Sequence, residues 1–169
     1  MATAARTLYI IAAGLLFTFA TVAMSLSAWL ISKFNTNSFF VTTLSTRTRV
    51  RYTLFLSIWT MIFSALYLAL ALGARIRGAF GSWASHLFSL GIGWIMWLGS
   101  AISISTRFGG VLHCSSRGLL YCTQLNALQA LAWVIFCWIA AILLVMTFWA
   151  ATRMRKNDWN GYGSPLLEV

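Results

Sequence analysis

Residues able to do chemistry are scarce and widely spaced in this chain. Its only carboxylates, Asp158 and Glu168, lie near the carboxyl terminus, so nothing before residue 158 can act as a carboxylate acid, base or metal ligand. The two histidines, His86 and His113, are far apart and have no acidic partner nearby, whereas a metal site needs a closer set of ligands. The sequence therefore predicts no metal, no cofactor and no enzyme activity.

Cysteines are the remaining reactive side chains. Cys114 and Cys122 lie in one short segment, whereas Cys137 lies alone in a long apolar run. Two cysteines that close a short loop are most simply a disulfide bond, which requires an oxidising compartment. The alternative is two reduced thiols in a cytosolic loop.

The composition is that of an integral membrane protein. Hydrophobic residues make up 60% of the chain and charged residues 8%, with a mean hydropathy of +0.83. A soluble domain is about half apolar and about one quarter charged. A soluble globular fold is therefore excluded.

Four apolar segments are each long enough to cross a bilayer as a helix. They cover about residues 8–31, 52–74, 83–106 and 123–152, and none contains Lys or Arg. Apolar residues fill both faces of each segment, unlike the alternating strands of a membrane barrel. The sequence predicts an all-α fold, with a four-helix membrane domain over residues 1–153 and a short polar cytosolic tail over residues 154–169.

Charge does not orient this bundle. Lys and Arg divide six against six between the two sides of the membrane, so the positive-inside rule gives no answer. The orientation then depends on the cysteine pair. A disulfide between Cys114 and Cys122 would place the third loop outside and both termini in the cytosol.

Small residues predict how the helices pack. On the first span they follow one another at spacings of three and four, which places them on one helix face. This stripe comprises Gly14, Thr18, Thr21, Ser25, Ala28 and Ser32, and later spans add Ser57, Ser64 and Gly93. Helices in lipid associate through small residues and hydroxyl groups, so we expect these positions inside the bundle. The alternative, a hydroxyl-lined pore, is disfavoured by the interleaved Gly and Ala.

Tryptophans and a basic cluster are candidates for contacts outside the chain. The tryptophans that lie deep in the last two spans are Trp94, Trp97, Trp133 and Trp138. They suit either packing between helices or a lateral interface with lipid or another protein. The basic residues after the fourth span, Arg153, Arg155 and Lys156, predict contact with anionic lipid head groups.

The order of residues resembles the fungal MARVEL-domain family. The run from Arg49 to Thr60, the segment from Trp94 to Leu98 and the loop cysteines lie where that family has comparable features. The resemblance implies a tetraspan with cytosolic termini and a role in membrane apposition, lipid-domain organisation or traffic. It carries over no catalytic residue, and the arginine-rich first loop departs from the family pattern.

The sequence therefore favours a non-catalytic, membrane-organising tetraspan. We expect it in the plasma membrane or a secretory-pathway membrane, where it associates laterally with itself, with lipids or with a larger membrane protein. One alternative is an accessory subunit of a membrane enzyme or transporter, and another is an oligomeric pore. No nucleic-acid or metal partner is expected. A transporter of charged solutes is disfavoured because we expect no ionisable residue within the membrane-spanning part of the bundle.

Overall fold

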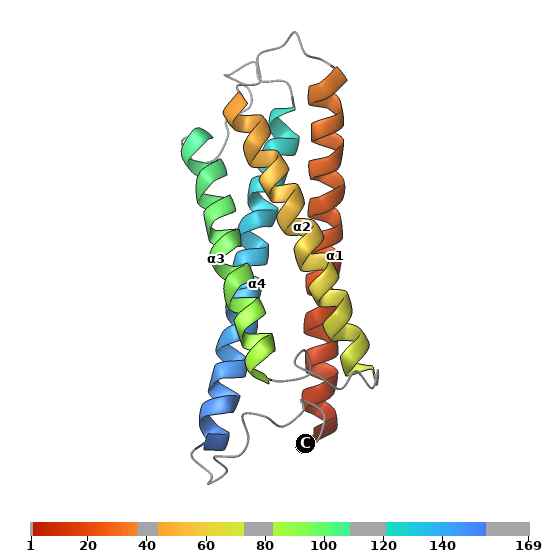
Figure 1. Ribbon diagram of the computed structural model, residues 1–169, viewed down its shortest axis with the longest axis vertical. Coiled ribbons are helices and arrows are strands. Elements are labelled where there is room, and N and C mark those ends of the chain that lie inside the picture. Colours follow the sequence, from red (N-terminus) through yellow and green to blue (C-terminus); the bar gives the residue numbers. More distant parts are fainter. Residues whose placement is uncertain (1, 37–43, 73–82, 109–120, 155–169) are drawn as a thin grey trace.

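The computed structural model describes residues 2–36, 44–72, 83–108 and 121–154. These residues form four helices and no strand: α1 (Ala2–Thr36), α2 (Leu44–Ala71), α3 (Trp83–Phe108) and α4 (Cys122–Met154) (Figure 1). Each helix contains a segment long and apolar enough to cross a membrane. The prediction of an all-α bundle with four membrane-spanning helices is confirmed, whereas the side on which the termini lie stays a prediction.

The helices extend beyond the apolar segments that predict them. α1 has 35 residues, about 50 Å at 1.5 Å per residue, and so exceeds the roughly 30 Å hydrocarbon core of a bilayer. α2 begins at Leu44 and not at about Tyr52. Hydropathy detects the part of a helix that lies in hydrocarbon, but not the turns that continue into the head-group region. The basic residues Arg47, Arg49 and Arg51 therefore lie on the first turns of α2.

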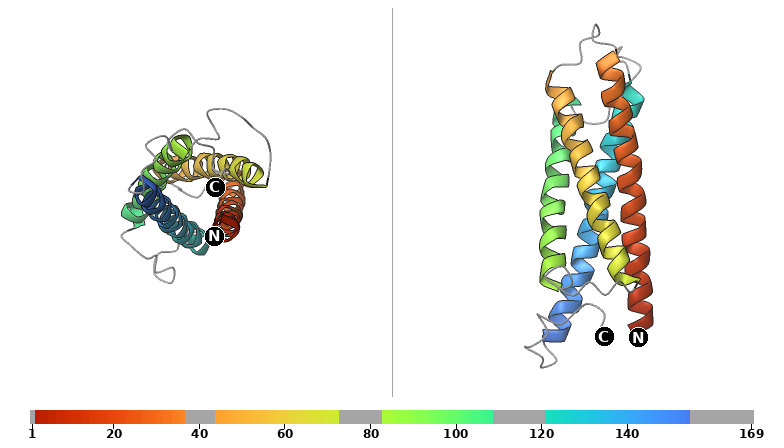
Figure 2. Two further views of the ribbon diagram at one scale, coloured as in Figure 1. Left: turned by 90° about the horizontal axis from the view of Figure 1, so that it is seen from below. Right: turned by 45° about the vertical axis from the view of Figure 1, so that its right-hand side comes forward.

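The four helices pack in chain order around a bundle with four corners (Figure 2). α1 packs most extensively against α2, and α3 packs most extensively against α4. Two clusters of buried apolar side chains fill the interior. One includes Leu56, Trp97 and Ile135, and the other, nearer the start of α2, includes Leu30 and Leu128.

The small-residue stripe of α1 lies on the outside of the bundle. Thr18, Ser25 and Ala28 are exposed, so the prediction that they close the bundle is wrong. α1 also carries a second row of small residues, which includes Ala20 and Ala23, and both of these are fully buried. The sequence could not decide between the two rows, because both consist of small residues at helical spacing.

Ser32 is exposed as well, whereas the remaining positions of the predicted packing set are at least partly covered. Gly14 and Thr21 are half-buried beside the exposed stripe. Ser57, Ser64 and Gly93 are buried inside the bundle. The hydroxyl face of α2 is therefore turned inward, whereas that of α1 is turned outward.

Candidate functional site: a buried histidine and tyrosine cluster

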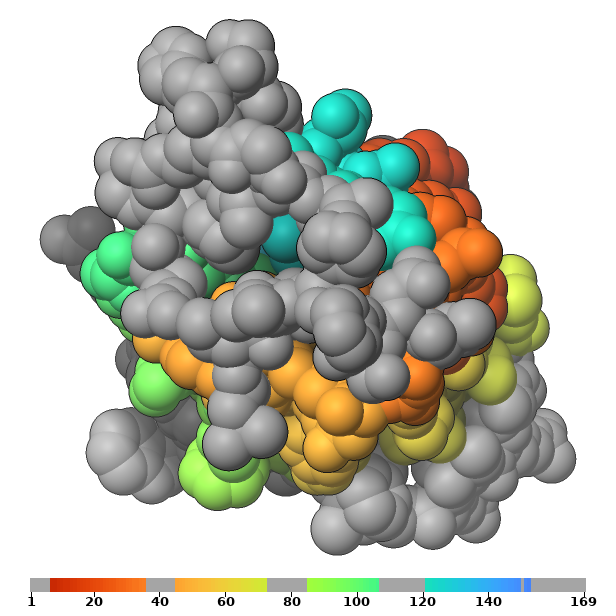
Figure 3. Space-filling view, turned by 90° about the horizontal axis from the view of Figure 1, so that it is seen from above, coloured from red at the N-terminus to blue at the C-terminus, as the bar shows by residue number. Residues whose placement is uncertain are grey.

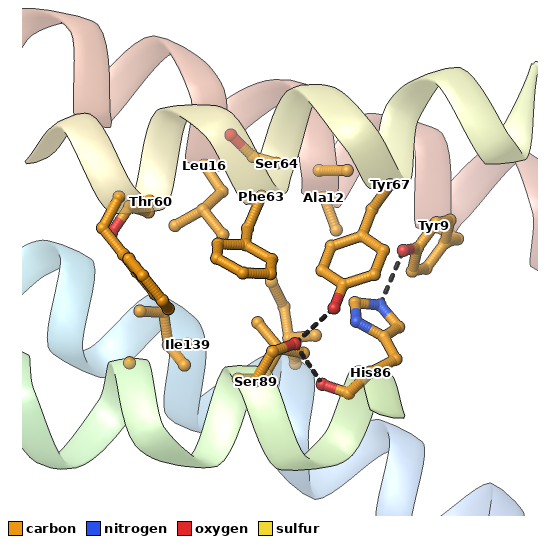
Figure 4. Close-up of a pocket in the computed structure, with 15 residues that line it drawn as sticks. Tyr9, Ala12, Leu16, Thr60, Phe63, Ser64, Tyr67, His86, Ser89 and Ile139 are labelled. Carbon is orange, nitrogen blue, oxygen red and sulfur yellow. Dashed lines mark hydrogen bonds between the residues drawn. The ribbon is translucent and has the colours of Figure 1, made fainter. Parts of the chain in front are cut away.

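One histidine and two tyrosines from three helices meet near the first turns of α1 (Figure 4). The hydroxyl oxygen of Tyr9 on α1 lies 2.6 Å from Nε2 of His86 on α3. The imidazole ring of His86 packs against Tyr67 of α2, with 3.8 Å between the ring centroids. His86 is 2% exposed and Tyr67 is 3% exposed. The three side chains therefore form a buried polar contact that joins α1, α2 and α3.

His86 corrects the expectation that the spans hold no ionisable residue. It lies within the third candidate span, Ser85–Thr106. In the sequence His86 is far from His113 and has no acidic residue nearby, so sequence spacing gives it no partner. The residues that surround it come from distant parts of the chain, and only the relative rotation of three helices brings them together.

The hydroxyl of Ser89 completes the cluster but does not form a catalytic pair with the imidazole. Ser89 is hydrogen-bonded to the hydroxyl of Tyr67, and its own hydroxyl donates to the backbone carbonyl of His86 at 3.0 Å. A nucleophilic serine needs a base within hydrogen-bond reach of its oxygen. Within the described residues, no such bond links Ser89 to the His86 ring, so the arrangement is typical of a structural contact.

A small cavity of about 40 Å³ borders the cluster. All four helices contribute to its wall, with Leu16 from α1, Thr60 and Ser64 from α2, Gly93 from α3 and Ile139 from α4. A buried water needs roughly 10–15 Å³ of such space, so the cavity has room for two or three water molecules. It is too small for a lipid or a typical organic substrate.

Two of the deep tryptophans make contacts inside the chain. Trp97 is 0% exposed, and its Nε1 donates a hydrogen bond to Oγ1 of Thr60 at 2.9 Å. The Nε1 of Trp138 donates to the carbonyl oxygen of Ala12 at 3.2 Å and so ties α4 to α1. A lateral-interface role is therefore wrong for Trp97, because its ring is enclosed, and Trp138 serves packing between helices.

The other two tryptophans lie closer to the surface. Trp94 is half-buried and stacks on Phe136 with 5.3 Å between the ring centroids. Trp133 is 37% exposed, and its Nε1 donates to Oγ of Ser105 at 3.2 Å. Of the four deep tryptophans, Trp133 is the one with an exposed ring, so it remains a candidate for lateral contact.

Some predicted site residues lie outside the described residues. Cys114, Arg155 and Lys156 are among them, and nothing is described of the side chain of Arg153. Cys122 is buried at the first residue of α4, and Cys137 is a free thiol on the exposed side of the same helix. The Cys114–Cys122 disulfide and the lipid contact of the basic cluster therefore stay predictions.

Comparison with known proteins found no match among family models, curated proteins or solved structures. The resemblance to the fungal MARVEL-domain family therefore also stays a prediction.

Proposed function

We propose that the protein is a non-catalytic, membrane-organising tetraspan that acts by lateral association in the plasma membrane or a secretory-pathway membrane. The observation that carries this proposal is the outer stripe of α1. We define this stripe by its exposed small residues, Thr18, Ser25, Ala28 and Ser32. A MARVEL-like role in membrane domains or traffic is the form of this function that the sequence favours.

The outer stripe suits contact with another transmembrane helix. Small side chains let two helix backbones approach closely in lipid. The hydroxyls of Thr18 and Ser25 donate to carbonyl oxygens of their own helix, at 2.8 Å and 2.9 Å. Covering them with a second helix therefore leaves no donor without an acceptor.

The outer face of α3 carries a row of large apolar residues, whereas on α1 large residues such as Val22 and Trp29 are exposed beside the row of small ones. The exposed residues of α3 include Phe88, Ile92, Ile95 and Ile102, which are large and apolar. Side chains of this kind suit contact with lipid chains and keep neighbouring helices apart. We therefore place the contact surface on α1, and not on α3.

The polar groups inside the bundle support a role without chemistry. Ser89 is hydrogen-bonded within the cluster, and the adjoining cavity has room for little more than water. The hydroxyls of Thr53 and Ser100 bond one another at 2.9 Å and so join α2 to α3. These groups stabilise contacts between helices, which also counts against a pore through a single chain.

Cysteine cross-linking in native membranes tests the proposal. In a Cys137→Ser background, Ser25→Cys places a thiol on the outer stripe, and Ile95→Cys places a matched thiol on the outer face of α3. Mild oxidation should cross-link Ser25→Cys into a larger species and leave Ile95→Cys as the monomer. A species of twice the mass indicates self-association, whereas attachment to a different polypeptide favours the accessory-subunit alternative.

Side-chain size provides the matched control. Ser25→Ala keeps the stripe small and should preserve the association, whereas Ser25→Leu should abolish it without unfolding the monomer, because Ser25 is exposed. Equal cross-linking from both helices, or none from Ser25→Cys, would show that the stripe faces lipid and would overturn the proposal.

A further inference from the structure

Three arginines lie on the first turns of α2, and none of the described residues is an acid that could neutralise them. α2 begins at Leu44 and carries Arg47, Arg49 and Arg51. No carboxylate occurs in the sequence before Asp158. The start of a helix is also the positive end of its dipole, where additional cations are unfavourable. An anion from outside the described residues would therefore stabilise this end of the helix.

Arg47 and Arg51 lie on the same flank of α2 because they are four residues apart. That flank lies against α1, since Nη2 of Arg47 donates a hydrogen bond to Oδ1 of Asn35 near the end of α1. Figure 3 looks down on this end of the bundle, where the first turns of α2 lie beside the last turns of α1. Like charges at this spacing repel one another unless an anion lies between them.

The hydrogen bonding of Arg47 is incomplete. Its Nε is buried and has no hydrogen-bond partner among the described residues. A guanidinium N–H that is removed from water and left unpaired is unfavourable. Arg51 is exposed one turn further along the helix. The flank therefore offers one oriented guanidinium and one accessible guanidinium, and neither has a negatively charged acceptor among the described residues.

The missing acceptor fits a phosphate group. Guanidinium groups bind phosphate oxygens through paired, charge-assisted hydrogen bonds. The candidate span of α2 begins at Ser45, so this flank lies at the edge of the apolar segment, at the depth of phospholipid head groups. A phospholipid holds its phosphate group at that depth in the membrane, whereas a free phosphate ion must come from solution.

We propose that Arg47 and Arg51 bind the phosphate of an anionic phospholipid head group beside α1, with Asn35 as the residue that positions Arg47. This site is distinct from the predicted lipid contact of Arg153, Arg155 and Lys156, which follows the other end of the bundle. It does not depend on lateral association through the outer stripe.

Lipid retention in nanodiscs tests the site. The full chain is reconstituted in nanodiscs of mixed phosphatidylglycerol and phosphatidylcholine. Native mass spectrometry then counts the lipids that stay bound after the protein is released from the nanodisc. The unsubstituted protein should retain phosphatidylglycerol in preference to phosphatidylcholine. Arg47→Gln combined with Arg51→Gln should lower that retention about thirtyfold, as expected for the loss of two basic contacts of about 1 kcal/mol each at an anionic surface.

Lys33→Gln is the matched control for a single charge at the same end. The Lys33 ammonium lies over the ring of Trp29, 5.9 Å from its centroid, and is not part of the Arg47 flank. Arg51→Gln should lower retention more than Lys33→Gln does. Because Arg51 is exposed, this variant still reports on the site if substitution of Arg47 impairs folding.

Inorganic phosphate distinguishes the two sources of the anion. If the occupant is a lipid, millimolar phosphate should leave the retained phosphatidylglycerol unchanged. Displacement of the lipid by phosphate would identify a site for the free anion and would overturn the lipid assignment. Equal losses with Arg51→Gln and Lys33→Gln, or no preference for phosphatidylglycerol, would show non-specific attraction by charge and would overturn the site.

Discussion

His86 illustrates how far the surroundings of one side chain depend on contacts between helices. Its partners Tyr9 and Tyr67 lie in two other helices, at sequence separations that follow no motif. Sequence reasoning could identify the histidine but not its neighbours, because their meeting depends on how α1, α2 and α3 are rotated. Trp97 presents the same difficulty. A tryptophan deep in a span suits a lateral interface, yet the ring of Trp97 is enclosed within the bundle.

Tyr9→Phe should lower the free energy of unfolding by about 1–2 kcal/mol, because it removes the hydroxyl that pairs with buried Nε2 of His86. The free energy is measured by unfolding the protein in mixed detergent micelles, with tryptophan fluorescence as the signal that monitors unfolding. Tyr52→Phe is the control, since its hydroxyl lies a longer 3.4 Å from the carbonyl oxygen of Met96 and should contribute less. Equal losses for the two variants would contradict the importance of the His86 contact.

The number of helices could be predicted from the sequence, but the faces that they turn inward could not. Each helix contains an uninterrupted apolar run, and such a run has few other stable forms in lipid. The two rows of small residues on α1 are equally compatible with an inward position, because in a membrane both the interior and the surroundings are apolar. The start of α2 was also missed, since its first turns are polar and hydropathy marks only the segment in hydrocarbon.

Two glycines on α3, Gly93 and Gly99, give a prediction for the stability of that helix. A Cβ atom added at Gly93 or Gly99 would meet no atom within 4 Å, apart from its chain neighbours and its own helix backbone. Gly93→Ala and Gly99→Ala should each raise the free energy of unfolding by about 0.5–1 kcal/mol, because alanine loses less backbone freedom in a helix. The same micelle assay measures both variants. Destabilisation by Gly93→Ala alone would mean that the buried space beside it is occupied.

The orientation of the molecule depends on its cysteines, since charge is balanced across the two ends. If Cys114 and Cys122 are bonded, thiol blocking of the intact native protein should modify only Cys137. After reduction all the cysteines should react, which intact-mass measurement detects as two further additions. A bridge over this short loop should contribute roughly 2–3 kcal/mol of stability. Modification of all three thiols before reduction would remove both the disulfide and the topology that rests on it.

The inward hydroxyls of α2 also bear on how the chain enters the bilayer during synthesis. Each donates a hydrogen bond to a carbonyl oxygen three or four residues earlier in its own helix, and they belong to Thr53, Ser57, Thr60 and Ser64. α2 leaves the ribosome before α3 exists, so its polar face must first tolerate lipid. Because every one of these donors is already satisfied within the helix, α2 can insert with α1 as a hairpin and remain stable in lipid before α3 is inserted. The bonds from α3 to Thr53 and Thr60 then form last, as the second hairpin docks.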